Sequence, residues 1–277
     1  MQRLKLRDKG DAVYLLQELL NDVGFPVTVT GTFDAATDAA VRAFQAASRL
    51  VSDGIVYTKS WTRLLNATTA NLNGVADKFL TEADLEEAAG QLQLELAVVK
   101  AVNEVESSGR GFLIDGNPKI LFEGHVFWQQ LTRRGFDPAR FRTGNESLIY
   151  PRFTRQFYQG GKAEYDRLNQ AIAIRATDPA WVEAAYASAS WGSFQIMGYH
   201  AGSLGYADVV SFVGAMNLGE REHLQAFNRF LDVNRLLPLL RRRDWAGFAR
   251  QYNGSGQVPI YTRRLEQAYV RHARPVG

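Results

Sequence analysis

Glu106 is the first residue whose type and position indicate chemistry. It lies near the end of the stretch LELAVVKAVNEVESSGRGFL, residues 94–113, in which apolar side chains recur at helical spacing until Ser-Ser-Gly breaks the pattern. A carboxyl group at the end of an apolar helix is partly desolvated, which raises its pKa. A carboxyl group that is protonated near neutral pH is what a general acid for glycoside cleavage requires. The alternative interpretation is a solvated glutamate at a frayed helix end.

Two later segments carry side chains suited to holding a sugar. They are SWGSFQIMG, which begins at Ser190, and FARQYNGSG, residues 248–256. Their glycines let the backbone bend close to a ligand, and Gln195, Tyr252 and Asn253 can hydrogen-bond sugar hydroxyl or N-acetyl groups. Taken singly, each segment is also typical of an ordinary turn.

The order and spacing of these segments resemble the lysozyme-like superfamily. ESSGRGFL, PKILFEGHVFW, SASWGSFQIMGYHA and FARQYNGSG are most similar to the N-acetylmuramidase domain of modular bacteriophage endolysins, over roughly residues 80–272. The resemblance implies hydrolysis of the β-1,4 bond between N-acetylmuramic acid and N-acetylglucosamine in bacterial peptidoglycan. It also implies that Glu106 protonates the glycosidic oxygen, because a sugar alkoxide is a poor leaving group.

The second catalytic carboxylate is left open between two candidates. Asp115 has the spacing from Glu106 that phage-type lysozymes show for their acid partner, whereas Glu123 lies in the family-like ILFEGH stretch. Asp115 is equally a turn residue beside Gly116, and Glu123 is equally a helix cap or an ion-paired acid. Some members of the superfamily work with one essential glutamate, so a second acid is not obligatory.

The N-terminal part of the chain predicts a small separate domain of three short helices. It resembles the three-helix peptidoglycan-binding domain found on many cell-wall enzymes. We therefore expect a peptidoglycan-binding domain at residues 1–67, a small and polar linker at 68–80, and the catalytic domain at 81–277. The matching positions are Gly10, Val13, Leu16, Gln17, Leu20, Gly24, Gly31, Thr32, Phe33, Thr37, Ala40, Val41, Phe44, Gln45, Asp53, Gly54, Ile55, Val56, Trp61 and Leu64.

The expected fold is mainly α, with a small β-hairpin lobe in the larger domain. Thr81 and the acids after it predict a helix start. Residues 111–122 predict a hairpin with Asp-Gly-Asn-Pro, residues 115–118, at its tip. Periodicity and capping predict further helices after Glu123 and at 161–174, 178–188, 217–233 and 260–272, with 144–160 irregular.

The composition excludes several kinds of site. The 277 residues include no cysteine, which removes disulfides, thiolate zinc sites and cysteine nucleophiles. The four histidines show no metal-ligand spacing, and no phosphate-binding loop or Gly-x-Ser-x-Gly motif occurs, so we expect neither a metal nor a cofactor. No window is apolar enough for a membrane span, and the N-terminus lacks the apolar core of a secretion signal.

Charge is distributed unevenly along the chain. Residues 77–106 hold eight acids against two lysines, whereas residues 234–277 hold nine arginines against two acids. The basic tail indicates an acidic partner, such as a wall polymer, nucleic acid or a membrane surface, unless it is simply a solvated helical face. A nucleic-acid binder would explain this tail but would leave the motifs of both domains unexplained. We expect a monomer that binds peptidoglycan, without nucleic acid or stable membrane insertion. The resemblance implies accumulation in the host cytoplasm and access to the periplasmic wall through a separate hole-forming protein.

Three other functions are compatible with parts of the sequence. A lytic transglycosylase cleaves the same bond but gives a 1,6-anhydro product, and the three segments do not distinguish it from a hydrolase. A wall-binding protein with an inactive lysozyme-like domain would be expected to have lost Glu106, which is present. A zinc amidase often carries the same binding domain, but its metal ligands are missing here.

Overall fold

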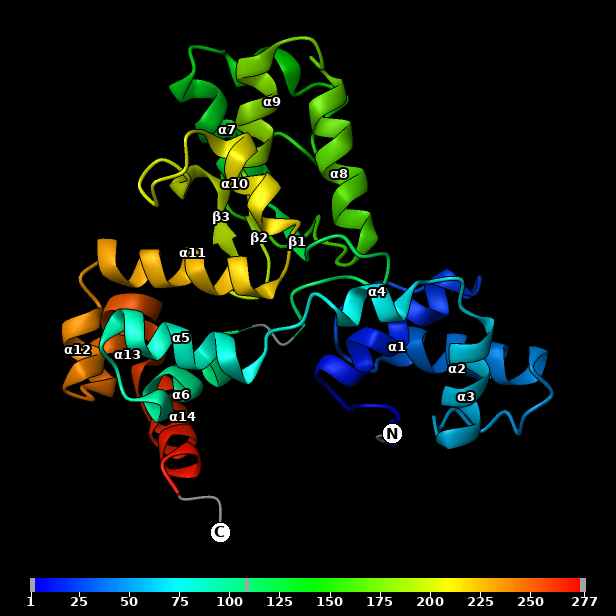
Figure 1. Cartoon of the computed structure of the whole chain (residues 1–277). Coiled ribbons are helices and arrows are strands. Elements are labelled where there is room, and N and C mark those ends of the chain that lie inside the picture. The colour runs from blue at the N-terminus through cyan, green and yellow to red at the C-terminus, as the bar shows by residue number, and fades with distance from the viewer. Residues whose placement is uncertain (1–2, 108–109, 275–277) are drawn as a thin grey trace.

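The structure is a computed structural model that describes residues 3–107 and 110–274. A small helical domain holds the N-terminus, and a larger helical domain consists of two lobes joined by a short sheet (Figure 1). The expectation of a mainly α fold with a small β element is confirmed. In the described part of the chain, no helix is both long and apolar enough to cross a membrane.

Two buried glutamine side chains organise the N-terminal domain. The Gln17 amide donates to Thr37 Oγ1 at 2.9 Å and accepts from the backbone of the loop before the second helix. Gln45 repeats this arrangement, accepting from Gly54 N and donating to the Ile55 carbonyl, both at 3.0 Å. Each amide replaces the water that its loop would otherwise need. The helices are α1 (Asp11–Asp22), α2 (Ala35–Ala47), α3 (Thr58–Ala67) and α4 (Leu72–Ala76), so the expected linker contains a short helix.

The larger domain begins with a capping box, as the sequence predicts. The Thr81 hydroxyl accepts from Asp84 N at 3.3 Å, and the Asp84 carboxylate accepts from Thr81 N at 2.8 Å. One lobe consists of α5 (Glu82–Leu92), α6 (Leu96–Glu106), α11 (Glu220–Val233), α12 (Leu237–Arg241), α13 (Trp245–Asn253) and α14 (Val258–His272). The other consists of α7 (Gly124–Arg133), α8 (Lys162–Ala173), α9 (Pro179–Ala187) and α10 (Val209–Met216), with 3-10 turns at Pro138–Phe141 and Gly198–His200. A further 3-10 turn, Ser255–Gln257, lies between α13 and α14 in the first lobe.

The predicted hairpin at residues 111–122 is a turn rather than a pair of strands. A single bridge joins Phe112 to Pro118, and the chain then enters β1 (Ile120–Phe122). β1 pairs with β2 (Ala189–Trp191), and β2 forms the true hairpin with β3 (Ile196–Met197). The outgoing arm makes no strand because Ile114 packs into the core of the N-terminal domain. A tertiary contact therefore overrides the local pairing.

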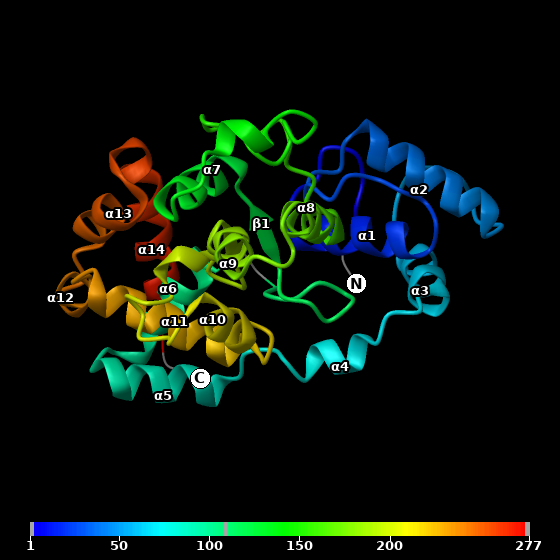
Figure 2. The same cartoon turned by 90° about the horizontal axis from the view of Figure 1, so that it is seen from above.

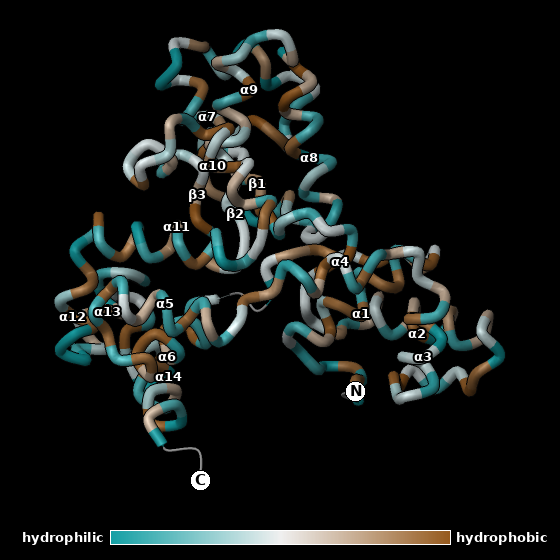
Figure 3. Tube along the Cα trace, viewed as in Figure 1, coloured by the Kyte–Doolittle hydropathy of each residue, from teal (hydrophilic) through white to brown (hydrophobic). Residues whose placement is uncertain are grey.

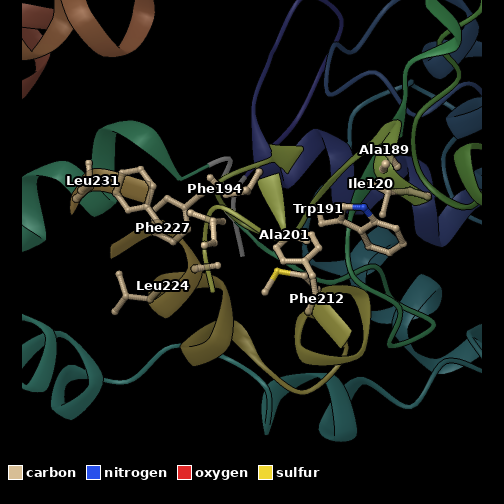
Figure 4. Packing of buried hydrophobic residues seen from close by; sticks show 14 of the residues in the cluster. Ile120, Ala189, Trp191, Phe194, Ala201, Phe212, Leu224, Phe227 and Leu231 are labelled. Atoms are coloured by element: carbon tan, nitrogen blue, oxygen red, sulfur yellow. The ribbon is translucent and has the colours of Figure 1, made fainter. Parts of the chain in front are cut away.

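Large aromatic side chains fill the core around the sheet (Figure 4), and Figure 3 shows hydrophobic stretches of the chain, in brown, near the sheet. Trp181 is completely buried, donates from Nε1 to the Ala171 carbonyl at 2.8 Å, and meets Phe127 edge to face. Phe194 stacks on Phe227 with ring centroids 4.2 Å apart. Because β2 is buried on both faces, this core fixes the positions of both ends of the β2–β3 hairpin.

The acid-rich and arginine-rich parts of the chain pack against each other. Arg271 and His272 on α14 both pair with Glu104 on α6, and Arg243 lies 3.7 Å from Glu95. Arg241 donates to the Leu92 carbonyl at 2.9 Å. Some basic side chains of the C-terminal part are therefore paired with acids of the same chain, although ion pairs as exposed as these contribute little stability.

Candidate active site

Glu106 is the last residue of α6, and Ser107 caps the helix in an extended conformation. Val98, Val99 and Val102 bury one side of the helix, and the glutamate carboxyl is left half-buried at its end. Desolvation raises the pKa of this carboxyl from 4.5 to about 7, against an opposing hydrogen bond from Asn253. Glu106 therefore holds its proton close to neutral pH. Ser108 and Gly109 of the motif lie outside the described residues.

The third segment brings two side chains to this carboxyl. Asn253, at the end of α13, donates from Nδ2 to Glu106 Oε1 at 3.3 Å. Burial raises the pKa of Tyr252, and the Glu106 charge raises it further, so the phenol remains a hydrogen-bond donor. Arg264 on α14 acts oppositely on the acid and lowers the pKa of Glu106.

Replacing Asn253 by alanine should move the alkaline limit of activity to higher pH. Its amide stabilises the ionised form of Glu106, so its loss favours the protonated acid. At pH 6 the rate should fall by less than about tenfold, the cost of one neutral hydrogen bond. The pH dependence of kcat/KM for wall digestion measures both effects, and an alkaline limit that moves to lower pH would contradict this role.

The second segment is the four-residue turn between β2 and β3. Ser190 Oγ donates to Gln195 Oε1 at 2.8 Å, and Gln195 Nε2 donates to the carbonyls of Gly192 at 2.8 Å and Lys119 at 3.2 Å. Gln195 adopts a left-handed conformation, with φ 50°. These two predicted sugar-binding residues are thus brought together, and their hydrogen bonds hold the turn against the segment before β1.

An aromatic stack connects this turn to the carboxyl. Phe194 lies parallel to Phe227 of α11, and the Phe227 ring meets Tyr252 edge to face at 5.8 Å. Tyr252 in turn stacks on Phe248 at 5.4 Å. The sequence segments around Glu106, Gln195 and Asn253 therefore converge through one continuous packed path, as Figure 4 shows for Phe194 and Phe227.

A buried histidine fixes the start of the same turn. His223 Nδ1 accepts from Ser193 N at 3.1 Å, and Nε2 lies 2.8 Å from the Met216 carbonyl, which requires the proton on Nε2. Gly192 leaves room for the ring, because a Cβ there would lie 2.6 Å from it. Burial lowers the pKa of His223 from 6.5 to about 4, so the ring stays neutral at the pH where the site works.

The contribution of His223 to stability should fall as the pH drops from about 6.5 to about 4. In that range the unfolded chain protonates His223 and the folded chain does not, so the unfolded state binds more protons and gains free energy. The shift corresponds to about 3 kcal/mol once the pH reaches 4. Urea unfolding across this range measures the effect. The variant His223→Gln should lose this part of the pH dependence, and an unchanged slope would show that His223 is not its source.

Comparison with known proteins decides the family. Residues 95–273 match the N-acetylmuramidase family, and residues 9–64 match a peptidoglycan binding domain family. The crystal structure of the Burkholderia AP3 phage endolysin is 40% identical in sequence, with a TM-score of 0.65, and the match covers 99% of this chain and 100% of that one. No curated protein matches the sequence.

The chain belongs to the N-acetylmuramidase family. It is a glycoside hydrolase of the lysozyme type, with a peptidoglycan-binding domain in front, which confirms the resemblance drawn from the sequence. In this family context, a half-buried glutamic acid at the end of a helix is the expected proton donor.

Glu123 lies in a separate polar cluster of the muramidase domain. Its carboxylate accepts from the Tyr158 hydroxyl and lies 3.3 Å from His125 Nδ1. Its backbone N–H donates to the Ser188 carbonyl at 3.0 Å, which extends the β1–β2 pairing by one residue. Alternate residues of a strand share a face, so Glu123 lies on the face of the sheet that carries Ser190.

Asp115 lies at the interface with the N-terminal domain. It occupies the turn after Leu113, where it accepts from Asn117 N at 3.1 Å. Together with Glu18 and Asp22 of α1 it lines a cavity of about 310 Å³. Among the described contacts, none joins Asp115 or Glu123 to Glu106.

Sequence reasoning missed Arg264 and Tyr261 as residues that act on the site. From the first half of α14, Arg264 lowers the pKa of Glu106 and Tyr261 raises the pKa of Tyr252. Their spacing of three residues places them on one helical face, but nothing in the sequence indicates which element that face meets. Within residues 3–107 and 110–274, no group of three or more acidic or histidine side chains is arranged to hold a metal.

Proposed function

We propose that this muramidase hydrolyses the β-1,4 bond between N-acetylmuramic acid and N-acetylglucosamine, with Glu106 as general acid. The observation that carries the proposal is the burial of the Glu106 carboxyl at the end of α6, which keeps it protonated up to about pH 7. Asn253 holds one carboxyl oxygen, so the other is available to the substrate. Proton transfer to the bridge oxygen makes the departing sugar a neutral alcohol.

Of the two candidate second acids, the structure favours Glu123. It is fixed on the sheet face beside Ser190, and its hydrogen bond with Tyr158 and its contact with His125 hold its orientation. Asp115 faces the N-terminal domain instead. In this role the ionised Glu123 would orient the attacking water or stabilise the oxocarbenium charge.

Digestion of purified sacculi, followed by mass analysis of the released fragments, tests the reaction. Hydrolysis gives reducing muramic acid ends. A lytic transglycosylase would give 1,6-anhydro ends that are lighter by one water. Reducing glucosamine ends would place the cleavage at the other β-1,4 bond, and intact glycan strands would refute the enzymatic proposal.

We also infer an endolysin role from the shared architecture. The domains are proposed as 1–67 for wall binding, 68–80 as connection and 81–277 for catalysis, and the protein is proposed to act as a monomer. The 40% identical protein is a phage endolysin, and it matches this chain over both domains. Synthesis in the host cytoplasm, followed by passage through holes made by another protein, would bring the enzyme to the wall. Expression with and without a hole-forming membrane protein tests this, because lysis should require both.

A further inference from the structure

The N-terminal domain is docked on the muramidase domain through a specific interface. Figure 2 shows α1 lying beside α8 and β1. The Tyr14 hydroxyl accepts from Gly161 N at 2.9 Å, and Val29 N donates to the Gln159 carbonyl at 3.2 Å. Ile114 of the muramidase domain enters the apolar core of the N-terminal domain. Contacts from two separate segments of the larger domain therefore fix the relative placement of the two domains.

Gly160 allows the two backbones to approach closely. A Cβ at this position would lie 1.9 Å from the Val29 carbonyl oxygen, and the residue has φ 71°, which favours glycine. Across the same interface, Lys119 Nζ lies 4.3 Å from the centre of the Tyr14 ring. The sequence is thus adapted to close contact here, which a loosely tethered binding domain does not require.

One interface contact reaches the segment that follows the catalytic acid. Glu18 on α1 forms an ion pair with Arg110, and their side chains are 4% and 20% exposed. Arg110 stands four residues after Glu106. The next residue, Gly111, donates its N–H to Glu220 Oε1 at 2.6 Å. Two carboxylates, one from each domain, therefore hold Arg110 and Gly111 in place.

The ion pair is suited to a positional role because both charges are removed from water. Burial lowers the pKa of Arg110, which means that its guanidinium depends on neighbouring negative charge. The guanidinium also offers a planar set of donors whose direction is fixed by a carboxylate. Without Glu18 the guanidinium would lose its ion-pair partner.

We propose that Glu18 is a positioning residue for the glycosidase reaction: it fixes Arg110, four residues after Glu106, so the wall-binding domain contributes to the catalytic rate as well as to wall attachment. This inference rests on the proposed role of Glu106. It assigns the N-terminal domain a function that wall binding alone does not include.

The test is Glu18→Gln in the full chain, assayed on a soluble wall tetrasaccharide so that attachment to insoluble wall does not limit the rate. We expect kcat to fall about tenfold, as a small displacement of the acid would cause, with KM within about twofold of the parent. Binding to sacculi should be unchanged. The matched control is Asp38→Asn, which breaks an ion pair with Arg42 in the same domain away from the interface and should leave kcat unchanged.

A double variant separates a positioning role from general loss of structure. If Glu18 acts through Arg110, Glu18→Gln combined with Arg110→Gln should lose no more rate than the more impaired single variant. Arg110→Lys keeps the charge and loses the planar donors, so it should fold and show an intermediate kcat; it decides the question if Glu18→Gln fails to fold. The inference would be overturned if the folded variants kept the parental kcat. It would also be overturned if the loss of rate in the double variant equalled the product of the losses in the two single variants.

These outcomes are distinct from failure of the proposed function. If Glu106→Gln remained active, the proposed general acid would be wrong whatever Glu18 does. If Glu106 is essential and Glu18→Gln keeps the parental kcat, only the coupling between the domains is refuted.

Discussion

Glu106→Gln should lower the rate of wall digestion by about 10³-fold, the usual contribution of a general acid. The amide keeps the size of the side chain and its contact with Asn253 but has no proton to donate at pH 6. Release of soluble fragments from purified sacculi measures the rate, and the folded variant should still bind walls. In the parent, kcat/KM should fall about tenfold for each pH unit above about 7, as Glu106 ionises.

The same substitution should stabilise the protein at alkaline pH. The folded-state pKa of Glu106 lies above that of the unfolded chain. Between 4.5 and about 7 this carboxyl therefore holds its proton more in the folded state, and its contribution to stability falls as pH rises. Glutamine removes this cost, which amounts to about 3 kcal/mol above pH 7. Urea unfolding at pH 4.5 and pH 8 should therefore show parent and variant alike at the lower pH and the variant more stable at the higher. Equal stability at pH 8 would mean that Glu106 is not desolvated.

Glu164→Ala should destabilise the muramidase domain by about 4 kcal/mol. Glu164 is fully buried and pairs with Arg167 at 2.7 Å. Its carboxylate also accepts from Phe122 N at 3.1 Å and Gln159 N at 2.7 Å. It therefore connects α8 to the end of β1 and to residues 159–161, which contact the N-terminal domain. Truncation leaves a buried guanidinium without its counter-charge and backbone N–H groups without an acceptor, which is the costly way to break a buried pair.

Chemical unfolding of the Glu164→Ala variant measures this loss. The control is Arg140→Ala, which removes an exposed ion pair with Asp137 and should change the free energy of unfolding by less than about 0.5 kcal/mol. Loss of Glu164 should also loosen the backbone beside Glu123, because the bond to Phe122 N lies one residue before it. A change below about 1 kcal/mol would show that Arg167 finds another partner.

The helices of the larger domain were largely predictable because their signals are local. The stretch 161–174 became α8 at Lys162–Ala173, and 178–188 became α9 at Pro179–Ala187. In both, apolar periodicity acts within one or two turns, and Asp178 also caps the start of α9. The sheet was less predictable. Its central strand, β2, lies 67 residues after β1 ends, so the partner of Ile120–Phe122 is a non-local choice.

In the candidate site, too, the features set by neighbouring residues were predictable and those set by distant contacts were not. The sequence identified Glu106, Gln195 and Asn253 because carboxyl and amide groups beside helix ends and glycines are visible as residue types. It could not decide whether Asp115 or Glu123 is the better candidate for the second catalytic carboxylate, because both follow Glu106 closely in the chain. The fold separated them when Ile114 packed into the N-terminal domain and took Asp115 to the interface, while the β1–β2 pairing carried Glu123 to the sheet.

By itself the sequence determined the two domains' family resemblance, the mainly helical fold and the residue types of the site, because periodicity, caps and short motifs are properties of neighbouring residues. Only the tertiary structure decided that Asn253 contacts Glu106, that His223 holds the turn between β2 and β3, and that Glu18 pairs with Arg110. These contacts join residues 30 to 147 positions apart. They exist because buried polar groups must find partners wherever packing brings them, and no local pattern records that pairing.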